Sequence, residues 1–301
     1  MNCLNEALES VWNSGDEVAL NDLPAHSPWV SRLLDISPWS RDERTAEDIE
    51  REYNREKYGP ALDLLLRDGG INTPEELFAR ANSELTHLVC ARGSQFRRLT
   101  PAASQAIKTE LLTNLIKNFL PAEAIIDLGA GLGDLILRLA ADPDCAGTRL
   151  FALEKMSHAR LIISELARRQ GLAPQVGYCD VFDGCLSGDL ELPSGAVIVT
   201  SGVICLGTRA TIETVSALEA LGPKMVIHFE PFPSFFNLDT LYGQLCWSYA
   251  LKNRHNITFD RDLFNLDGHE LKIIETVPFV FGNNPFFPLS MIAWVPLESG
   301  H

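Results

Sequence analysis

The feature that most constrains the fold of this chain is the segment 125–134, which reads IIDLGAGLGD. An apolar stretch runs into Asp127, and glycines follow at three alternate positions, Gly129, Gly131 and Gly133. Because glycine lacks a Cβ, the backbone after the strand can bend sharply and approach a ligand closely before a helix begins. The pattern therefore predicts a strand–turn–helix unit that binds a nucleoside or nucleotide.

A second predicted strand, RLFALEK, ends in Glu154, where the ribose of an adenosine needs a carboxylate. The dinucleotide fingerprint G-x-G-x-x-G does not fit, since Asp134 stands at its third glycine position. A pyrophosphate also disfavours a carboxylate nearby. A ligand without phosphate is therefore expected.

The segment resembles motif I of the class I S-adenosylmethionine (SAM) dependent methyltransferases, and the resemblance extends over about residues 121–297. The matching residues are Asp127, Gly129, Gly131 and Gly133. The resemblance implies that SAM is bound and that Glu154, followed by Lys155, holds the two ribose hydroxyls. It also implies that Asp180, in GYCDVFD, pairs with the adenine amine while Val181 and Phe182 pack on the ring.

The pattern of the chain predicts two parts. Residues 1–120 read as a helical N-terminal cap, and residues 121–301 alternate strand and helix in an α/β, doubly wound, Rossmann-like methyltransferase sheet of seven strands. Two strands after residue 269, with a turn at 283–285, match the antiparallel hairpin that closes such a sheet. Within the cap, a charged helix from Thr45 is expected to break and hinge near Gly59-Pro60. Its tyrosines, Tyr53 and Tyr58, either cover the cofactor or belong to a solvated face.

Composition limits the partners. The 301 residues carry a formal net charge of −15, which disfavours an extended nucleic-acid surface, because affinity for phosphate backbones comes mainly from Lys and Arg. No segment reads as a signal peptide or spans the roughly 18 apolar residues of a membrane helix. Scattered cysteines offer no metal-ligand spacing. We expect a cytoplasmic protein with a small-molecule substrate, no membrane or nucleic-acid partner and no metal; the oligomeric state stays open.

The remaining candidates lie at strand exits or beside the glycine turn. After the fourth strand the chain reads TSGVICLG, without the N/D-P-P-Y type element of many amine and adenine methyltransferases, and Ser201 is its candidate for substrate contact or a turn residue. Glu230, in IHFEP, is the candidate acceptor-side carboxylate, and His228 shares its face of the strand. Upstream, Arg97 or Arg98 is expected to bind the carboxylate of SAM's methionine end, or to be solvated.

Three functions follow from these features. The leading one is transfer of the SAM methyl group to a small molecule or carrier-bound metabolite by in-line attack on the sulfonium. The second arises because the chain also looks somewhat like the azetidine-2-carboxylate synthases, in which the methionine amine attacks its own γ-carbon and releases methylthioadenosine. The third is a non-catalytic SAM-binding protein, which the lack of an evident general base permits.

Overall fold

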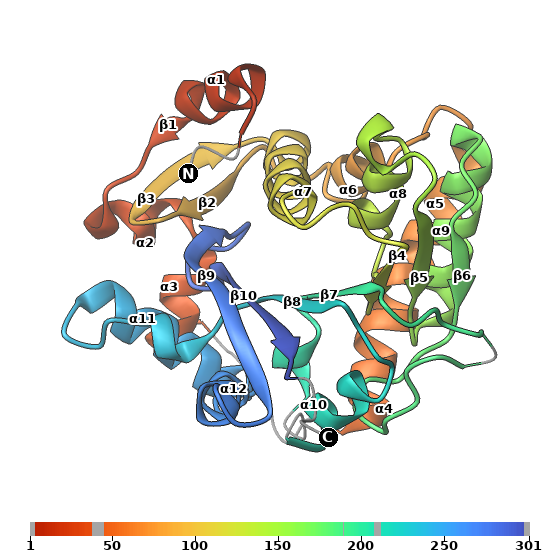
Figure 1. Ribbon diagram of the computed structural model, residues 1–301. Coiled ribbons are helices and arrows are strands. Elements are labelled where there is room, and N and C mark those ends of the chain that lie inside the picture. The colour runs from red at the N-terminus through yellow and green to blue at the C-terminus, as the bar shows by residue number, and fades with distance from the viewer. Residues whose placement is uncertain (1–3, 38–44, 189, 208–211, 298–301) are drawn as a thin grey trace.

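Seven strands form the central sheet of the computed structural model, in the order β6-β5-β4-β7-β8-β10-β9 (Figure 1). They are β4 (Ala124–Leu128), β5 (Arg149–Leu153), β6 (Gln175–Gly177), β7 (Val197–Ser201), β8 (Met225–Glu230), β9 (Leu271–Phe281) and β10 (Leu289–Pro296). All neighbouring strands are parallel except β10, which is antiparallel to β8 and β9. The predicted doubly wound sheet with its terminal hairpin is confirmed.

The structure describes residues 4–37, 45–188, 190–207 and 212–297. The helices of the N-terminal part are α1 (Glu6–Ser14), α2 (Leu23–His26), α3 (Pro28–Leu33), α4 (Ala46–Glu50), the π-helix η2 (Arg51–Tyr58), α5 (Gly59–Arg67), α6 (Pro74–Ala81) and α7 (Pro101–Lys117). Those that follow are α8 (Asp134–Ala140), α9 (Ser157–Gln170), α10 (Ile212–Glu219), α11 (Leu241–Lys252) and α12 (Phe259–Leu266). Short 3-10 turns are η1 (Leu20–Asp22), η3 (Pro143–Cys145), η4 (Ile204–Leu206) and η5 (Pro233–Phe235). No helix within these ranges is long and apolar enough to cross a membrane.

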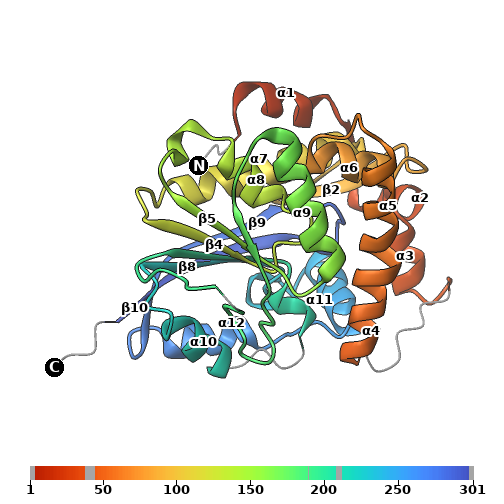
Figure 2. The same ribbon diagram turned by 90° about the vertical axis from the view of Figure 1, so that its right-hand side faces the viewer.

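Helices cover both faces of the sheet, with α7, α8 and α9 on one side and α10 and α12 on the other (Figure 2). Successive strand residues point to opposite faces, so Ile125 joins the core beneath α7–α9 while Ile126 joins the core beneath α10 and α12. The five residues of β4 are all buried, as expected of a central parallel strand covered on both sides. The order of connections reverses between β4 and β7, and ligands of open α/β sheets bind at such a switch point.

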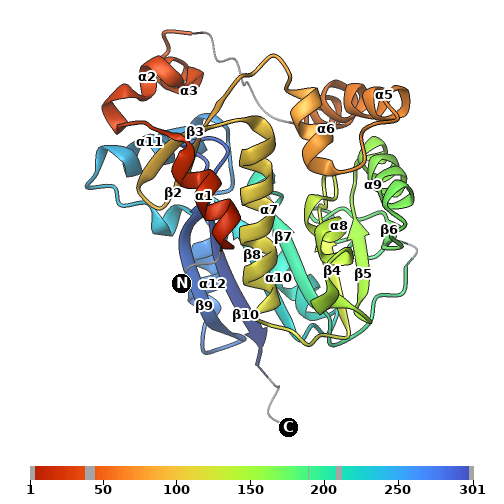
Figure 3. The same ribbon diagram turned by 90° about the horizontal axis from the view of Figure 1, so that it is seen from above.

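The N-terminal part is not wholly helical, which corrects the prediction for residues 88–99. There β2 (Leu88–Arg92) and β3 (Gln95–Leu99) form a hairpin, and β1 (Asp16–Glu17) pairs with β3. Gly93 turns the hairpin at φ +58°. Ala91 exchanges two backbone hydrogen bonds with Gly282, at 2.8 and 2.9 Å, so the hairpin is joined to the chain just after β9 (Figure 3). Each strand of this hairpin has only five residues, too few for the spacing of apolar residues to distinguish a strand from a helix in the sequence.

The expected break at Gly59-Pro60 is also wrong, because α4, η2 and α5 form one helix over residues 46–67. The Gly59 amide donates to the Asn54 carbonyl, five residues earlier, in the wider π register. Pro60 then lies in the first turn of α5, where its missing N–H is tolerated. The helix passes the proline without a hinge.

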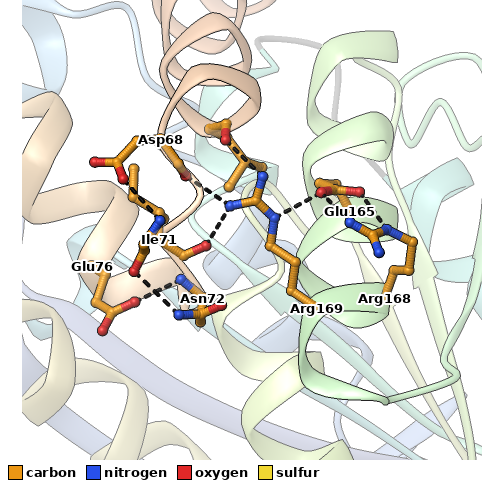
Figure 4. A network of polar contacts seen from close by, with 9 residues as sticks. Asp68, Ile71, Asn72, Glu76, Glu165, Arg168 and Arg169 are labelled. Carbon is orange, nitrogen blue, oxygen red and sulfur yellow. Dashed lines mark hydrogen bonds and ion pairs between the residues drawn. The ribbon is translucent and has the colours of Figure 1, made fainter.

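Arg169 fixes the end of this long helix to α9 (Figure 4). Its Nη1 donates to the carbonyls of Asp68 (2.9 Å) and Ile71 (2.7 Å), and its Nη2 donates to that of Leu65 (2.8 Å). The guanidinium thus satisfies carbonyls that the end of α5 leaves without helical partners. Its Nε donates to Glu165, which also binds the neighbouring Arg168.

Arg169→Ala should destabilise the protein, whereas Arg168→Ala should not. The Arg169 side chain is 12% exposed, and its loss removes hydrogen bonds to three carbonyls, of which, among the described residues, only that of Asp68 keeps another donor, the Ile71 amide; we therefore expect about 2 kcal/mol less free energy of unfolding. Arg168 is 72% exposed, and its ion pair is expected to contribute less than about 0.5 kcal/mol. Denaturant unfolding of both variants measures the difference. Equal losses would contradict the anchoring role of Arg169.

Candidate functional site

The glycine turn lies between the end of β4 and the start of α8, at the switch point of the sheet. Gly129, Gly131 and Gly133 all have positive φ, at 75°, 58° and 81°, where other residues are strained. A Cβ on Gly129 would lie 2.6 Å from Val203 Cγ2, and one on Gly133 would lie 2.9 Å from Ile163 Cγ1. The turn therefore needs glycine both for its conformation and for its packing against the loop after β7 and against α9.

Glu154 connects this turn to the exit of β5. Its Oε2 accepts a hydrogen bond from the Gly131 amide and its Oε1 accepts one from the Met156 amide, both at 2.8 Å. The side chain is buried, which raises its pKa, while the two amides favour the ionised form. Each carboxylate oxygen retains a second lone pair for a ligand. The Glu154 carboxylate thus lies against the glycine turn, and its contact with a ribose stays a prediction.

Three carboxyl groups lie around the turn, those of Asp127, Asp134 and Glu154. Asp134 and Glu154 are close enough to Asp127 for their charges to act on it. Asp127 is the fourth residue of β4 and is 2% exposed. Burial, together with the charges of Asp134 and Glu154, raises its pKa to about 8. Asp134 accepts hydrogen bonds from Gln105 (2.5 Å) and Lys108 (3.3 Å) on α7. Such a site favours a ligand that carries positive charge.

Asp127→Asn should remove a pH dependence of stability in the free protein. The pKa of Asp127 is about 8 in the folded chain and 3.8 ordinarily, so between these values the folded state holds more protons than the unfolded state. The free energy of unfolding should therefore fall as the pH rises through this window, by up to about 1.4 kcal/mol per pH unit. Denaturant unfolding across the window measures the slope. An asparagine variant with the wild-type slope would refute the assignment.

The predicted adenine-side residues follow β6. Asp180 is buried, forms an ion pair with Lys155 and accepts the Phe182 amide at 3.1 Å. Val181 is buried beside it, and the ring of Phe182 lies flat against Gly207, where a Cβ would be 1.9 Å from the ring. Lys155, which the sequence placed beside the ribose, is thus engaged with the Asp180 carboxylate. The exits of β5 and β6 meet at the Lys155–Asp180 pair, and the contact of these residues with a cofactor stays a prediction.

Glu230 has a different place from the one that the sequence suggested. It is 1% exposed, and it accepts hydrogen bonds from the amides of Val203 (3.0 Å), Ile204 (3.1 Å) and Cys205 (3.2 Å). Thr200 Oγ1 adds a contact of 3.3 Å. Burial raises the pKa of Glu230, and these amides oppose that rise. The carboxylate positions the turn after β7, instead of facing an acceptor.

His228 extends this buried network. Trp294 Nε1 donates to His228 Nε2 at 3.0 Å, and because an indole N–H only donates, Nε2 must be the acceptor. The Nδ1 atom then carries the proton and donates to Thr200 Oγ1 at 2.8 Å, which leaves the Thr200 hydroxyl hydrogen for Glu230. Burial lowers the pKa of His228 to about 3, in keeping with a neutral ring. His228 is thus a structural histidine.

The two remaining candidate site residues, Ser201 and Arg97, lie on different strands, β7 and β3. Ser201 is partly exposed at the end of β7, before Gly202 with φ +65°, and its contact with a substrate stays a prediction. Arg97 donates to the carbonyls of Asn13 (3.3 Å) and Gly15 (2.8 Å) at the end of α1. Its guanidinium is engaged there, and the structure does not bring it together with the glycine turn.

The long helix 46–67 brings Tyr58 to the turn. Tyr58 is 8% exposed, and a Cβ on Gly131 would lie 3.4 Å from its hydroxyl. The ring of Tyr53 is 6.1 Å away, between centroids. Of the two roles that the sequence left open for these tyrosines, the position of Tyr58 favours a cover over the turn.

Several residues of this region were missed by sequence reasoning, among them Trp294, Gln105, Asn54 and His158. Each acts through a partner distant in the sequence, such as Trp294 with His228 or His158 with Asn54. No local spacing indicates such pairs. A polar residue within an apolar strand, as His228 is in IHFEP, is the one available signal of a buried partner.

No family model matches the chain, and no curated protein matches its sequence. Among solved structures, the chain is similar to the magnesium protoporphyrin IX methyltransferase of Synechocystis PCC 6803 with bound SAM, at 14% identity and a TM-score of 0.49, over 85% of this chain and 99% of that one. It is also similar to the mitomycin 7-O-methyltransferase MmcR, at 17% identity and a TM-score of 0.45, over 90% of this chain and 69% of that one. The glycopeptide N-methyltransferase MtfA, in complex with SAM, gives 11% identity and a TM-score of 0.40, over 62% and 86%. Likeness at this level leaves the function to be argued from the strand order and from the residues of the turn.

Proposed function

We propose that this protein binds SAM at the turn after β4 and transfers its methyl group to a small molecule or carrier-bound metabolite. The observation that carries the proposal is the carboxylate of Glu154, which is fixed by the Gly131 and Met156 amides at the exit of β5. This observation supports the proposal, because a carboxylate that could accept hydrogen bonds from ribose hydroxyls lies beside a glycine turn at the switch point of the sheet. In the proposal, residues 1–120 form a cap and residues 121–301 form the SAM-binding domain.

The charge of the turn supports SAM over a phosphate-bearing nucleotide. The carboxylates of Asp134 and Glu154 would repel a pyrophosphate, whereas SAM carries an ammonium and a sulfonium. Asp127 holds its proton in the free protein because its pKa is about 8, and a neighbouring cation would favour its ionised form. The three carboxyl groups around the turn therefore fit the positively charged SAM.

The residues of the chain would divide the work between holding SAM and shaping the reaction space. Glu154 would orient the ribose, and Asp180 with Val181 and Phe182 would hold the adenine. When bound, SAM supplies an electrophilic methyl carbon, so the protein mainly has to align the acceptor and exclude water. The turn held by Glu230 would form one wall, because its Val203 packs against Gly129. Ser201 would contact the acceptor or the methionine end of SAM.

The test is calorimetric titration with S-adenosylhomocysteine, followed by incubation with SAM and analysis of the nucleoside products by mass spectrometry. Binding together with S-adenosylhomocysteine formation in the presence of candidate acceptors would support methyl transfer. Methylthioadenosine formed from SAM alone above the no-enzyme background, with a matching amount of azetidine-2-carboxylate, would instead establish the cyclising reaction, and binding without turnover would indicate a non-catalytic protein. A chain that does not bind S-adenosylhomocysteine would refute the proposal.

A further inference from the structure

The π-helical segment η2 reaches the glycine turn with its last residue, Tyr58, as part of the helix 46–67, which runs beside α9 (Figure 2). A π-helix is rare, and where it occurs it frequently marks a functional site. Here it spans the eight residues Arg51–Tyr58, and its last residue is the one that reaches the turn. Two residues of this segment, Asn54 and Tyr58, make the contacts that fix its position.

Asn54 fastens η2 to the first turn of α9. Its side-chain Oδ1 accepts the His158 amide at 3.0 Å, and its side-chain Nδ2 lies 3.3 Å from Ser157 Oγ. Its backbone carbonyl is 2.7 Å from His158 Nδ1, and since a carbonyl only accepts, Nδ1 carries the proton. This contact lies four residues after Glu154, so the segment is fixed next to the proposed ribose site.

Tyr58 presents its hydroxyl to the glycine turn. The residue is more than nine-tenths buried, and its hydroxyl lies 3.4 Å from the Cβ position of Gly131, whose amide binds Glu154. Within the described ranges of the chain this hydroxyl makes no hydrogen bond. Burial, with the charges of Glu154, Tyr53 and Asp134, raises the pKa of Tyr58 well above its ordinary value, so the hydroxyl keeps its proton. The hydroxyl oxygen itself is not sealed off from solvent, so it is open to donate a hydrogen bond to a ligand at the turn.

We propose that Tyr58 is a cofactor-binding residue whose hydroxyl donates a hydrogen bond to the ribose that Glu154 holds; the inference rests on the proposed function. The chemistry of the two groups is complementary. A ribose hydroxyl that donates its hydrogen to the Glu154 carboxylate still has lone pairs to accept a hydrogen bond. Glu154 has only acceptors, whereas Tyr58 supplies the donor on the other side of Gly131. The helix 46–67 is then a fixed wall of the cofactor site.

The experiment compares Tyr58→Phe with the control Tyr53→Phe, which alters the neighbouring ring of the same segment. Calorimetric titration with S-adenosylhomocysteine should show about tenfold weaker binding for Tyr58→Phe and little change for Tyr53→Phe. The unliganded Tyr58→Phe protein should melt at the wild-type temperature or higher, because the lost hydroxyl has no partner in the free chain. A purely structural role would lower that melting temperature.

A second set of ligands tests the ribose contact itself. Methylthioadenosine and its 2′-deoxy and 3′-deoxy analogues should differ in affinity for the wild type, and one of these differences should shrink in Tyr58→Phe. Wild-type affinity of Tyr58→Phe for S-adenosylhomocysteine, or unchanged differences among the analogues, would overturn the inference alone. A wild-type protein that binds none of these ligands would overturn both the inference and the proposed function.

Discussion

Glu154→Ala is expected to weaken the binding of S-adenosylhomocysteine by about 3 kcal/mol, roughly a hundredfold. The proposed site gives the Glu154 carboxylate two ribose hydroxyls, and hydrogen bonds to a charged group contribute about 1.5–3 kcal/mol each. The change also removes the acceptor of the Gly131 and Met156 amides, so the Gly131 end of the glycine turn loses its side-chain anchor. The lost ribose contacts and the altered turn should both weaken the binding of S-adenosylhomocysteine.

Isothermal titration calorimetry measures this effect directly. Glu84→Ala is a suitable control, because Glu84 is an exposed glutamate that precedes β2 and lies outside the proposed site. Its affinity for S-adenosylhomocysteine should equal that of the wild type. If Glu154→Ala also kept wild-type affinity, Glu154 would not hold the ribose, and the assignment of the cofactor site would fail.

Glu230→Ala is expected to be the most destabilising single substitution of the set, at about 3–5 kcal/mol. Its carboxylate accepts three backbone amides, those of Val203, Ile204 and Cys205, and these would be left buried without an acceptor. Thr200 would also lose the acceptor at the end of the network that begins at Trp294. The turn after β7 should loosen, and with it the packing of Val203 on Gly129.

Chemical denaturation, with Glu270→Ala as an exposed control near the start of β9, measures the loss of stability. The control should unfold within about 0.5 kcal/mol of the wild type. Glu230→Gln separates shape from charge, since it keeps the volume and one acceptor oxygen but turns an NH₂ group toward the amides. It should fall between wild type and Glu230→Ala. A Glu230→Ala protein as stable as the wild type would contradict the positioning role.

The errors of sequence reasoning have a common cause. The break expected at Gly59-Pro60 followed from local propensity, but Asn54 holds the helix to His158, 104 residues away, and a π register carries it past the proline. The role expected for Arg97 followed from its nearness in sequence to the glycine turn. In space, its partners are the carbonyls of Asn13 and Gly15. Contacts between distant segments overrode the local pattern in each case.

The sequence by itself determined the doubly wound sheet, its closing hairpin and the glycine turn followed by Glu154, because hydrophobic periodicity and the need for positive φ are local properties of the chain. Only the tertiary structure decided what the buried polar groups do. In the folded chain, Glu230 accepts hydrogen bonds from the turn after β7, and Tyr58 of the N-terminal part lies beside Gly131. A buried polar group must find partners wherever the fold places them, so its role depends on which elements pack together and not on its own neighbours in sequence.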